Sequence, residues 1–157
     1  MKNKQINKLV FVEVNNVNRD DAFYYLNLLK LGYVDKYDEW LNYYLETENP
    51  LSDIVLALAT CGSNPEISIR LLQEYCSEQP LNQTVITEKF RLFFKEAYYS
   101  NWMNQEEILS VVKKLLRQGI GCSAEGTDFD TILDMYDLAK DGIIENFDEL
   151  FLLFLEG

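Results

Sequence analysis

Helix-breaking residues are few in this chain, and their positions divide it into segments of helical length. Its 157 residues include three prolines and seven glycines. Between these breaks, apolar side chains recur every three or four residues, which is the spacing of an amphipathic helix. Glycine favours the position just after a helix and proline the first helical position. Four glycines are therefore expected to end helices: Gly32, Gly62, Gly119 and Gly142.

The segments between the breaks predict helices of ordinary length. They span residues 20–31, 36–48, 52–61, 64–77, 85–100, 104–119, 130–140 and 147–156. An asparagine stands at the expected cap position of four of them: Asn18, Asn64, Asn104 and Asn146. Pro65 follows one of these caps directly. Glutamates three residues after the last two, Glu107 and Glu149, predict reciprocal capping boxes.

Short connections between these helices indicate how the helices pack. Consecutive helices joined by about two to eight residues form antiparallel hairpins. The sequence therefore predicts an all-α fold of seven to eight helices packed as antiparallel helical hairpins, with an irregular helical stack left open. It shows no fixed-period repeat and no composition break, so residues 1–157 are expected to form one helical domain. Within it, residues 1–17 are expected to form an arm or a short first element.

Composition excludes several classes of function. The chain has 26 acidic and 14 basic residues, a net charge of −12, and no histidine. The negative charge argues against nucleic-acid binding, and the lack of histidine removes His-dependent catalysis and His-ligated metals. Three cysteines without a Cys-x-x-Cys pair, and no spanning apolar run, favour a cytoplasmic protein with no membrane partner. We expect no catalytic residues, metal or cofactor; a carboxylate-based, metal-dependent hydrolase is a less favoured alternative.

Negative charge is concentrated toward the C-terminus. Residues 120–157 contain ten acidic side chains and one basic side chain, Lys140. Aspartates spaced four, three and four residues apart fall on one face of the expected helix. A face of one sign suits a basic partner, although a merely solvated face is the alternative. The expected partner-binding residues of this block are Asp128, Asp130, Asp134, Asp137 and Asp141.

A second acidic block combines carboxylates with tyrosines. We expect Trp40, Leu41, Tyr44 and Leu45 to form the inward stripe of the helix over residues 36–48. Exposed tyrosines beside carboxylates are typical of protein interfaces. Burial of Tyr37 and Tyr43 in the core is an equally weighted alternative. The expected partner-binding residues of this block are Asp35, Tyr37, Asp38, Glu39 and Tyr43.

Residues 37–65, 90–107 and 136–142 resemble a family of small, all-helical bacterial immunity proteins of contact-dependent growth inhibition and related polymorphic toxin systems. The resemblance implies an antitoxin that binds the toxin domain of a large secreted protein made by a neighbouring gene. Such toxins are often RNases, whose substrate clefts are basic. The hypothesis is therefore neutralisation of a basic nuclease domain by electrostatic and steric occlusion. A helical adaptor or scaffold with no toxin partner is the alternative.

Overall fold

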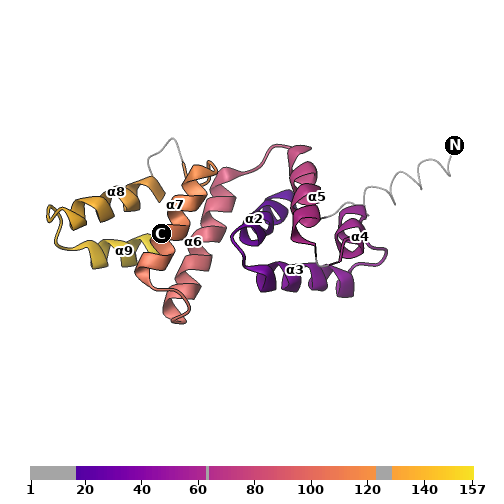
Figure 1. The fold of residues 1–157 in the computed structure, drawn as a ribbon, viewed down its shortest axis with the longest axis horizontal. Helices are drawn as coiled ribbons and strands as arrows, with labels where there is room; N and C mark the ends of the chain where they lie inside the picture. Colours follow the sequence, from indigo (N-terminus) through magenta and orange to yellow (C-terminus); the bar gives the residue numbers. More distant parts are fainter. Residues whose placement is uncertain (1–16, 63, 123–128) are drawn as a thin grey trace. The chain divides into compact units, whose positions relative to one another are not determined.

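The computed structural model describes residues 17–62, 64–122 and 129–157, and these residues form an all-α fold with no β-strand. Figure 1 shows its helices: α2 (Arg19–Lys30), α3 (Val34–Thr47), α4 (Asp53–Thr60), α5 (Pro65–Ser77), α6 (Gln83–Tyr99), α7 (Gln105–Arg117), α8 (Phe129–Lys140) and α9 (Phe147–Glu156). The all-α prediction is confirmed. The expected arm lies outside the described residues, except for Val17.

The helices fall into two compact units, Met1–Leu81 and Asn82–Gly157. In the first unit α2 packs against α3, α3 against α4 and α4 against α5, and α5 packs back against α2. The second unit repeats this pattern with α6, α7, α8 and α9, in which α9 packs back against α6. Among the residues that the structure describes, each unit thus contains four helices, of which the last packs back against the first. That residues 1–157 make one domain stays a prediction.

Most of the helix ends lie where the sequence places them. Asn18 Oδ1 accepts a hydrogen bond from the backbone N–H of Asp21, and Asn64 caps α5 directly before Pro65. Asn104 and Glu107 form the predicted capping box, since each side chain accepts a hydrogen bond from the other's backbone N–H. The four glycines expected to end helices all have positive φ: Gly32, Gly62, Gly119 and Gly142.

The predicted capping box at the start of α9 is wrong. Asn146 is the N-cap residue, but its side chain accepts no hydrogen bond from the described residues of the helix. Its φ of −103° and ψ of 35° lie outside the extended region that capping residues adopt, so the side chain is not aimed at the first turn. The reciprocal pair with Glu149 therefore does not form.

A group of aromatic side chains from α2 and α3 packs within the largely aliphatic core of the first unit. Trp40 stacks on Tyr25 with ring centroids 5.0 Å apart and meets Tyr44 edge-on at 5.6 Å. Tyr37 joins them in the core. Leu45 is 36% exposed, so its expected inward position is wrong. The buried stripe of α3 follows positions 37, 40 and 44, and Leu45 lies at the edge of that stripe.

Two buried tyrosines of this core differ in whether the hydroxyl group is hydrogen-bonded. The Tyr75 hydroxyl donates to the backbone carbonyl of Val17. The Tyr37 hydroxyl is buried and makes no hydrogen bond of normal geometry within the described chain. Burial raises the pKa of Tyr37, and the neighbouring Ser68 hydroxyl offsets part of this effect. The Tyr75 hydroxyl should therefore stabilise the fold, whereas the Tyr37 hydroxyl should contribute nothing or destabilise it.

We expect Tyr75→Phe to lower the free energy of unfolding by about 1–3 kcal/mol, because it leaves the Val17 carbonyl buried without this hydrogen bond. Tyr37→Phe should be neutral or stabilising by about 1 kcal/mol, because it removes a buried hydroxyl that lacks a well-formed hydrogen bond within the described chain. Urea unfolding of the two variants beside the unmodified chain measures both effects. A larger loss for Tyr37→Phe than for Tyr75→Phe would contradict this assignment.

Candidate partner-binding surface

Helix α8 carries the acidic face that its sequence spacing predicts. Phe129 and Ile132 are buried, and this sets the inward side of the helix. Four aspartates are exposed, and we call them the α8 acidic face: Asp130, Asp134, Asp137 and Asp141. Asp128, predicted with them, lies outside the described residues.

The α8 acidic face is not neutralised by the cations of the described residues. None of its aspartates forms an ion pair with another residue of the ranges 17–62, 64–122 and 129–157. Lys140, on the same helix, instead lies over the ring of Tyr136, 4.5 Å from its centroid. The negative charge of the face is therefore open to compensation by solvent or by a partner.

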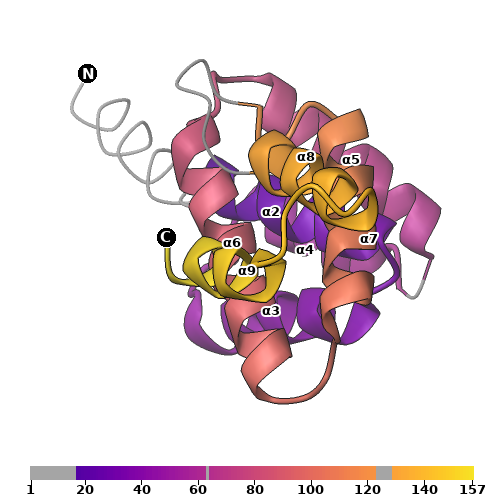
Figure 2. The same ribbon diagram turned by 90° about the vertical axis from the view of Figure 1, so that its left-hand side faces the viewer.

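Further carboxylates lie next to this face, where α8 turns into α9. The two helices run side by side in both views (Figures 1 and 2) and pack against each other. Glu145, Asp148 and Glu149 are exposed in the connection and at the start of α9. Asp148 accepts a hydrogen bond of 3.1 Å from the side chain of Gln105, which ties the start of α9 to the start of α7.

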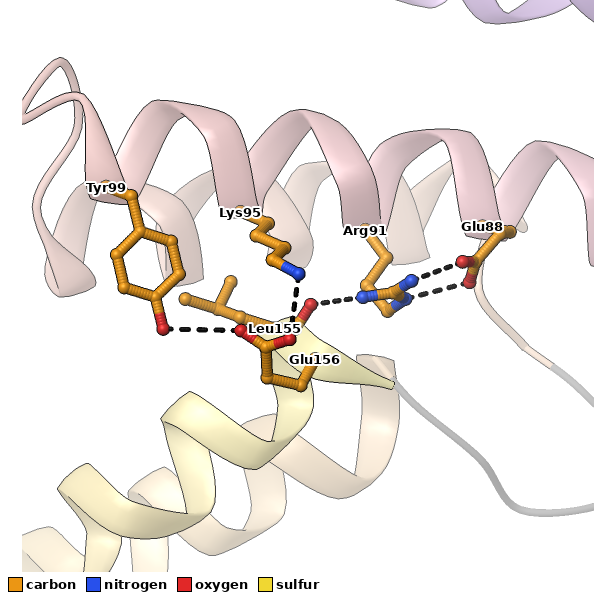
Figure 3. A network of polar contacts seen from close by, with 6 residues as sticks. All are labelled: Glu88, Arg91, Lys95, Tyr99, Leu155 and Glu156. Carbon is orange, nitrogen blue, oxygen red and sulfur yellow. Dashed lines mark hydrogen bonds and ion pairs between the residues drawn. The ribbon is translucent and has the colours of Figure 1, made fainter.

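Basic side chains of α6 are committed to a different contact. Figure 3 shows a polar network between α6 and the end of α9, formed by Glu88, Arg91, Lys95, Tyr99, Leu155 and Glu156. Arg91 pairs with Glu88 and donates to the Leu155 carbonyl. Lys95 pairs with Glu156 at 2.7 Å. This network holds α9 on α6 and neutralises two cations there.

Two carboxylates of this network have lowered pKa values because they accept hydrogen bonds from cations. The hydrogen bond from Lys95 lowers the pKa of Glu156, and the hydrogen bond from Arg91 lowers the pKa of Glu88. Both carboxylates are largely exposed, so these pairs are weak individually. The end of α9 is held by the contacts of Arg91 with the Leu155 carbonyl and of Lys95 with Glu156.

The second predicted set lies on α3, in the first unit. Asp35, Asp38, Glu39 and Tyr43 are exposed, and we call them the α3 acidic face; Tyr43 is 61% exposed. The expectation that Tyr37 lies on this surface is wrong, because its side chain is only 5% exposed. It shares the buried stripe of the helix with Trp40 and Tyr44, one and two turns further on.

Sequence reasoning missed a cavity between the end of α6 and the start of α7. Its volume is about 420 Å³, and its lining residues are Tyr98, Tyr99, Asn101, Met103, Asn104 and Glu107. Asn101 has a φ of 58°, a left-handed conformation that asparagine tolerates better than most residues. The clue in the sequence was the absence of glycine between two helices that are only a few residues apart.

Other kinds of site find little support in the described residues. No three Cys, Asp or Glu side chains lie close enough together there to hold a metal ion. All three cysteines are free, and burial raises the pKa of Cys76 to about 11, so this thiol is protonated at neutral pH. None of the helices α2 to α9 has the length and apolar character needed to cross a membrane, as far as the described residues extend.

The structure is therefore that of an all-α protein with a row of exposed carboxylates on α8 and a separate cavity at the start of α7. Comparison of the chain with models of protein families, with curated proteins and with solved structures finds no match.

Proposed function

We propose that this chain is an immunity protein that binds and neutralises a cognate toxin domain, a basic RNase or other nuclease encoded by a neighbouring gene. It acts without catalysis, by covering the toxin. The observation that carries the proposal is the α8 acidic face, whose four aspartates are exposed and form no ion pair with the described residues. The resemblance of three sequence segments to immunity proteins supports the same function.

The inhibition follows from the chemistry of a nuclease. A nuclease must hold phosphates, so its substrate cleft is lined by basic side chains. A face of fixed carboxylates competes for those side chains with nucleic acid. Complementary charge also speeds encounter, toward about 10⁸–10⁹ M⁻¹s⁻¹ at low salt, which suits capture of a toxin before it reaches its substrate.

Growth rescue tests the proposal directly. The 3′ end of the adjacent upstream gene is induced in a laboratory bacterium, with and without co-expression of this chain. Growth arrest that the chain relieves is the expected result. Toxicity that the chain does not relieve, or no toxicity at all, contradicts the proposal and favours the helical adaptor.

Charge reversal on α8 is expected to weaken toxin binding by well over tenfold. The variant is Asp134→Lys with Asp137→Lys, because close interfacial charge pairs are coupled by about 1.5–7 kcal/mol each. The matched control is Glu74→Lys with Glu96→Lys, which changes the net charge equally at exposed positions of α5 and α6. Calorimetric titration with the toxin domain at two salt concentrations measures the dissociation constants.

The control variant is expected to bind within a few-fold of the unmodified chain, and the salt dependence of the α8 variant should be smaller. Equal losses in the two variants would show that only net charge matters. Unchanged binding by the α8 variant would show that the α8 acidic face is not the contact.

A further inference from the structure

The cavity beside α7 has walls of defined chemistry. Tyr98 and Tyr99 meet at ring centroids 5.5 Å apart with an angle of 79° between the ring planes. The ring of Phe151 also packs edge-on against the ring of Tyr98, with the two centroids 5.3 Å apart. The Tyr98 hydroxyl makes no hydrogen bond within the described ranges, so it is left to a ligand or to solvent.

Backbone geometry builds the rim of the cavity. The N–H of Asn101 donates to the Tyr98 carbonyl at 3.1 Å, and the N–H of Trp102 donates to the Ala97 carbonyl at 2.9 Å. This pair of bonds ends α6 in a Schellman motif, with Asn101 in the left-handed position. The amide side chain of Asn101 is thereby held at the cavity by a fixed backbone.

A carboxylate supplies the charge of the cavity. Glu107 is exposed, and its Oε1 accepts a bond of 3.3 Å from the N–H of Asn104. Its second oxygen has no partner in the described chain. The start of a helix favours anions, but Asn104 already caps the N–H of Glu107, and Glu106 adds a second carboxylate in that turn.

The cavity therefore favours a cation over an anion. No lysine or arginine of the described residues lines it. Lys95, one turn before Tyr99 on α6, pairs with Glu156. Tyrosine rings attract cations through their faces, and a carboxylate adds a charge-assisted hydrogen bond. A planar guanidinium can stack on a ring and also donate several hydrogen bonds to carboxylate, amide and hydroxyl oxygens.

We propose that this cavity binds the guanidinium group of an arginine side chain presented by a partner protein. Its volume of about 420 Å³ lies in the range of small-ligand pockets, and its mixed aromatic and polar lining suits an arginine with its apolar stem. The arginine is an anchor of the interface, of the kind that dominates binding energy. The identification of this partner as the toxin rests on the proposed function. The inference that the cavity binds a guanidinium group rests only on the chemistry of the cavity.

The first test needs no partner. The full chain, labelled with ¹⁵N, is titrated with N-acetyl-arginine methylamide, and amide shifts are followed by NMR. We expect saturable shifts centred on residues 98–107, and none with the uncharged citrulline analogue. Shifts spread over the carboxylates of α8 and α3, or equal binding of the citrulline analogue, would overturn the proposal. Tighter binding of free agmatine than of the blocked arginine would point to a small-molecule ligand and overturn the assignment to a protein.

A pair of neighbouring variants gives the control. Glu107→Gln removes the charge but keeps a side chain that can complete the capping box. Glu106→Gln removes a charge that is also exposed and lies in the same turn, but outside the cavity lining. We expect Glu107→Gln to weaken binding of the blocked arginine about tenfold, the loss of one charge-assisted hydrogen bond, and Glu106→Gln to leave it unchanged. Equal effects would overturn the proposal.

The same two variants separate this proposal from the proposed function. In the growth-rescue assay the unmodified chain reports on immunity, and Glu107→Gln against Glu106→Gln reports on the cavity. Rescue by the unmodified chain, with toxin affinity equal in the two variants, overturns the arginine anchor and leaves the immunity function standing. Selective loss of affinity in Glu107→Gln supports both.

Discussion

We expect Gly121→Ala to destabilise the Asn82–Gly157 unit by about 3 kcal/mol or more, enough to unfold a marginal four-helix unit. Gly121 has a φ of +86°, a backbone angle that residues with a Cβ adopt at a cost of about 1–2 kcal/mol. A Cβ at this position would lie 2.2 Å from Cδ2 and 2.4 Å from Cγ of Phe129. That ring is fully buried, so it cannot move aside without disturbing the core.

Gly119→Ala provides the matched control two residues earlier. Gly119 has a similar φ of +78°, but apart from its own residue and its two chain neighbours, no heavy atom of the described chain lies within 4 Å of an added Cβ. This variant should lose only about 1–2 kcal/mol, the backbone contribution alone. Urea unfolding followed by circular dichroism measures both variants. If the two lose equal stability, the contact with Phe129 does not explain the requirement for glycine.

The sequence predicts local features of this fold well, because they depend on interactions between near neighbours. Asn64 before Pro65, and Asn104 with Glu107, form caps within one turn of chain, so their residue types suffice to locate them. Asn146 has the right sequence but the wrong backbone angles, and those angles are set by how the chain enters α9. Local pattern does not specify that entry.

Contacts between distant segments lie beyond such reasoning. The sequence places Gly121 in a loop, but its close approach to Phe129 depends on how the start of α8 packs. Tyr37 and Tyr43 are both tyrosines of α3, and the rotation of that helix on its neighbours decides that one is buried and the other exposed. The cavity escaped prediction because it depends on Asn101 ending α6 in a conformation usually supplied by glycine.

The acidic face of α8 is predictable in part, because its spacing is local but its neutralisation depends on distant segments. Spacing alone predicts that Asp130, Asp134 and Asp137 share one side of α8, because helical geometry fixes it. Whether cations of the same unit neutralise them depends on where those cations pack. Arg91 and Lys95 are held on α6 by contacts with Glu88 and with the end of α9.

The second large effect is expected at the centre of the Asn82–Gly157 unit. Phe94 is fully buried, and its ring centroid lies 5.8 Å from those of Phe93 and Phe129 and 6.4 Å from that of Phe90. Phe94→Ala should lower the free energy of unfolding by about 3–5 kcal/mol, because it removes buried apolar surface and leaves a cavity that rigid aromatic neighbours cannot fill.

Two controls separate packing from the loss of an aromatic ring or of a helical residue. Phe94→Leu keeps most of the volume and should lose clearly less than Phe94→Ala. Leu92→Ala shortens a side chain that is 50% exposed on the same helix, and should lose about 1 kcal/mol or less. A loss in Phe94→Ala no larger than in Leu92→Ala would contradict the central position of this ring. A fully buried side chain cannot touch a partner. Under the proposed function, Phe94→Leu should therefore keep full affinity for the proposed toxin domain, whereas charge reversal on α8 should lower that affinity without a comparable loss of stability.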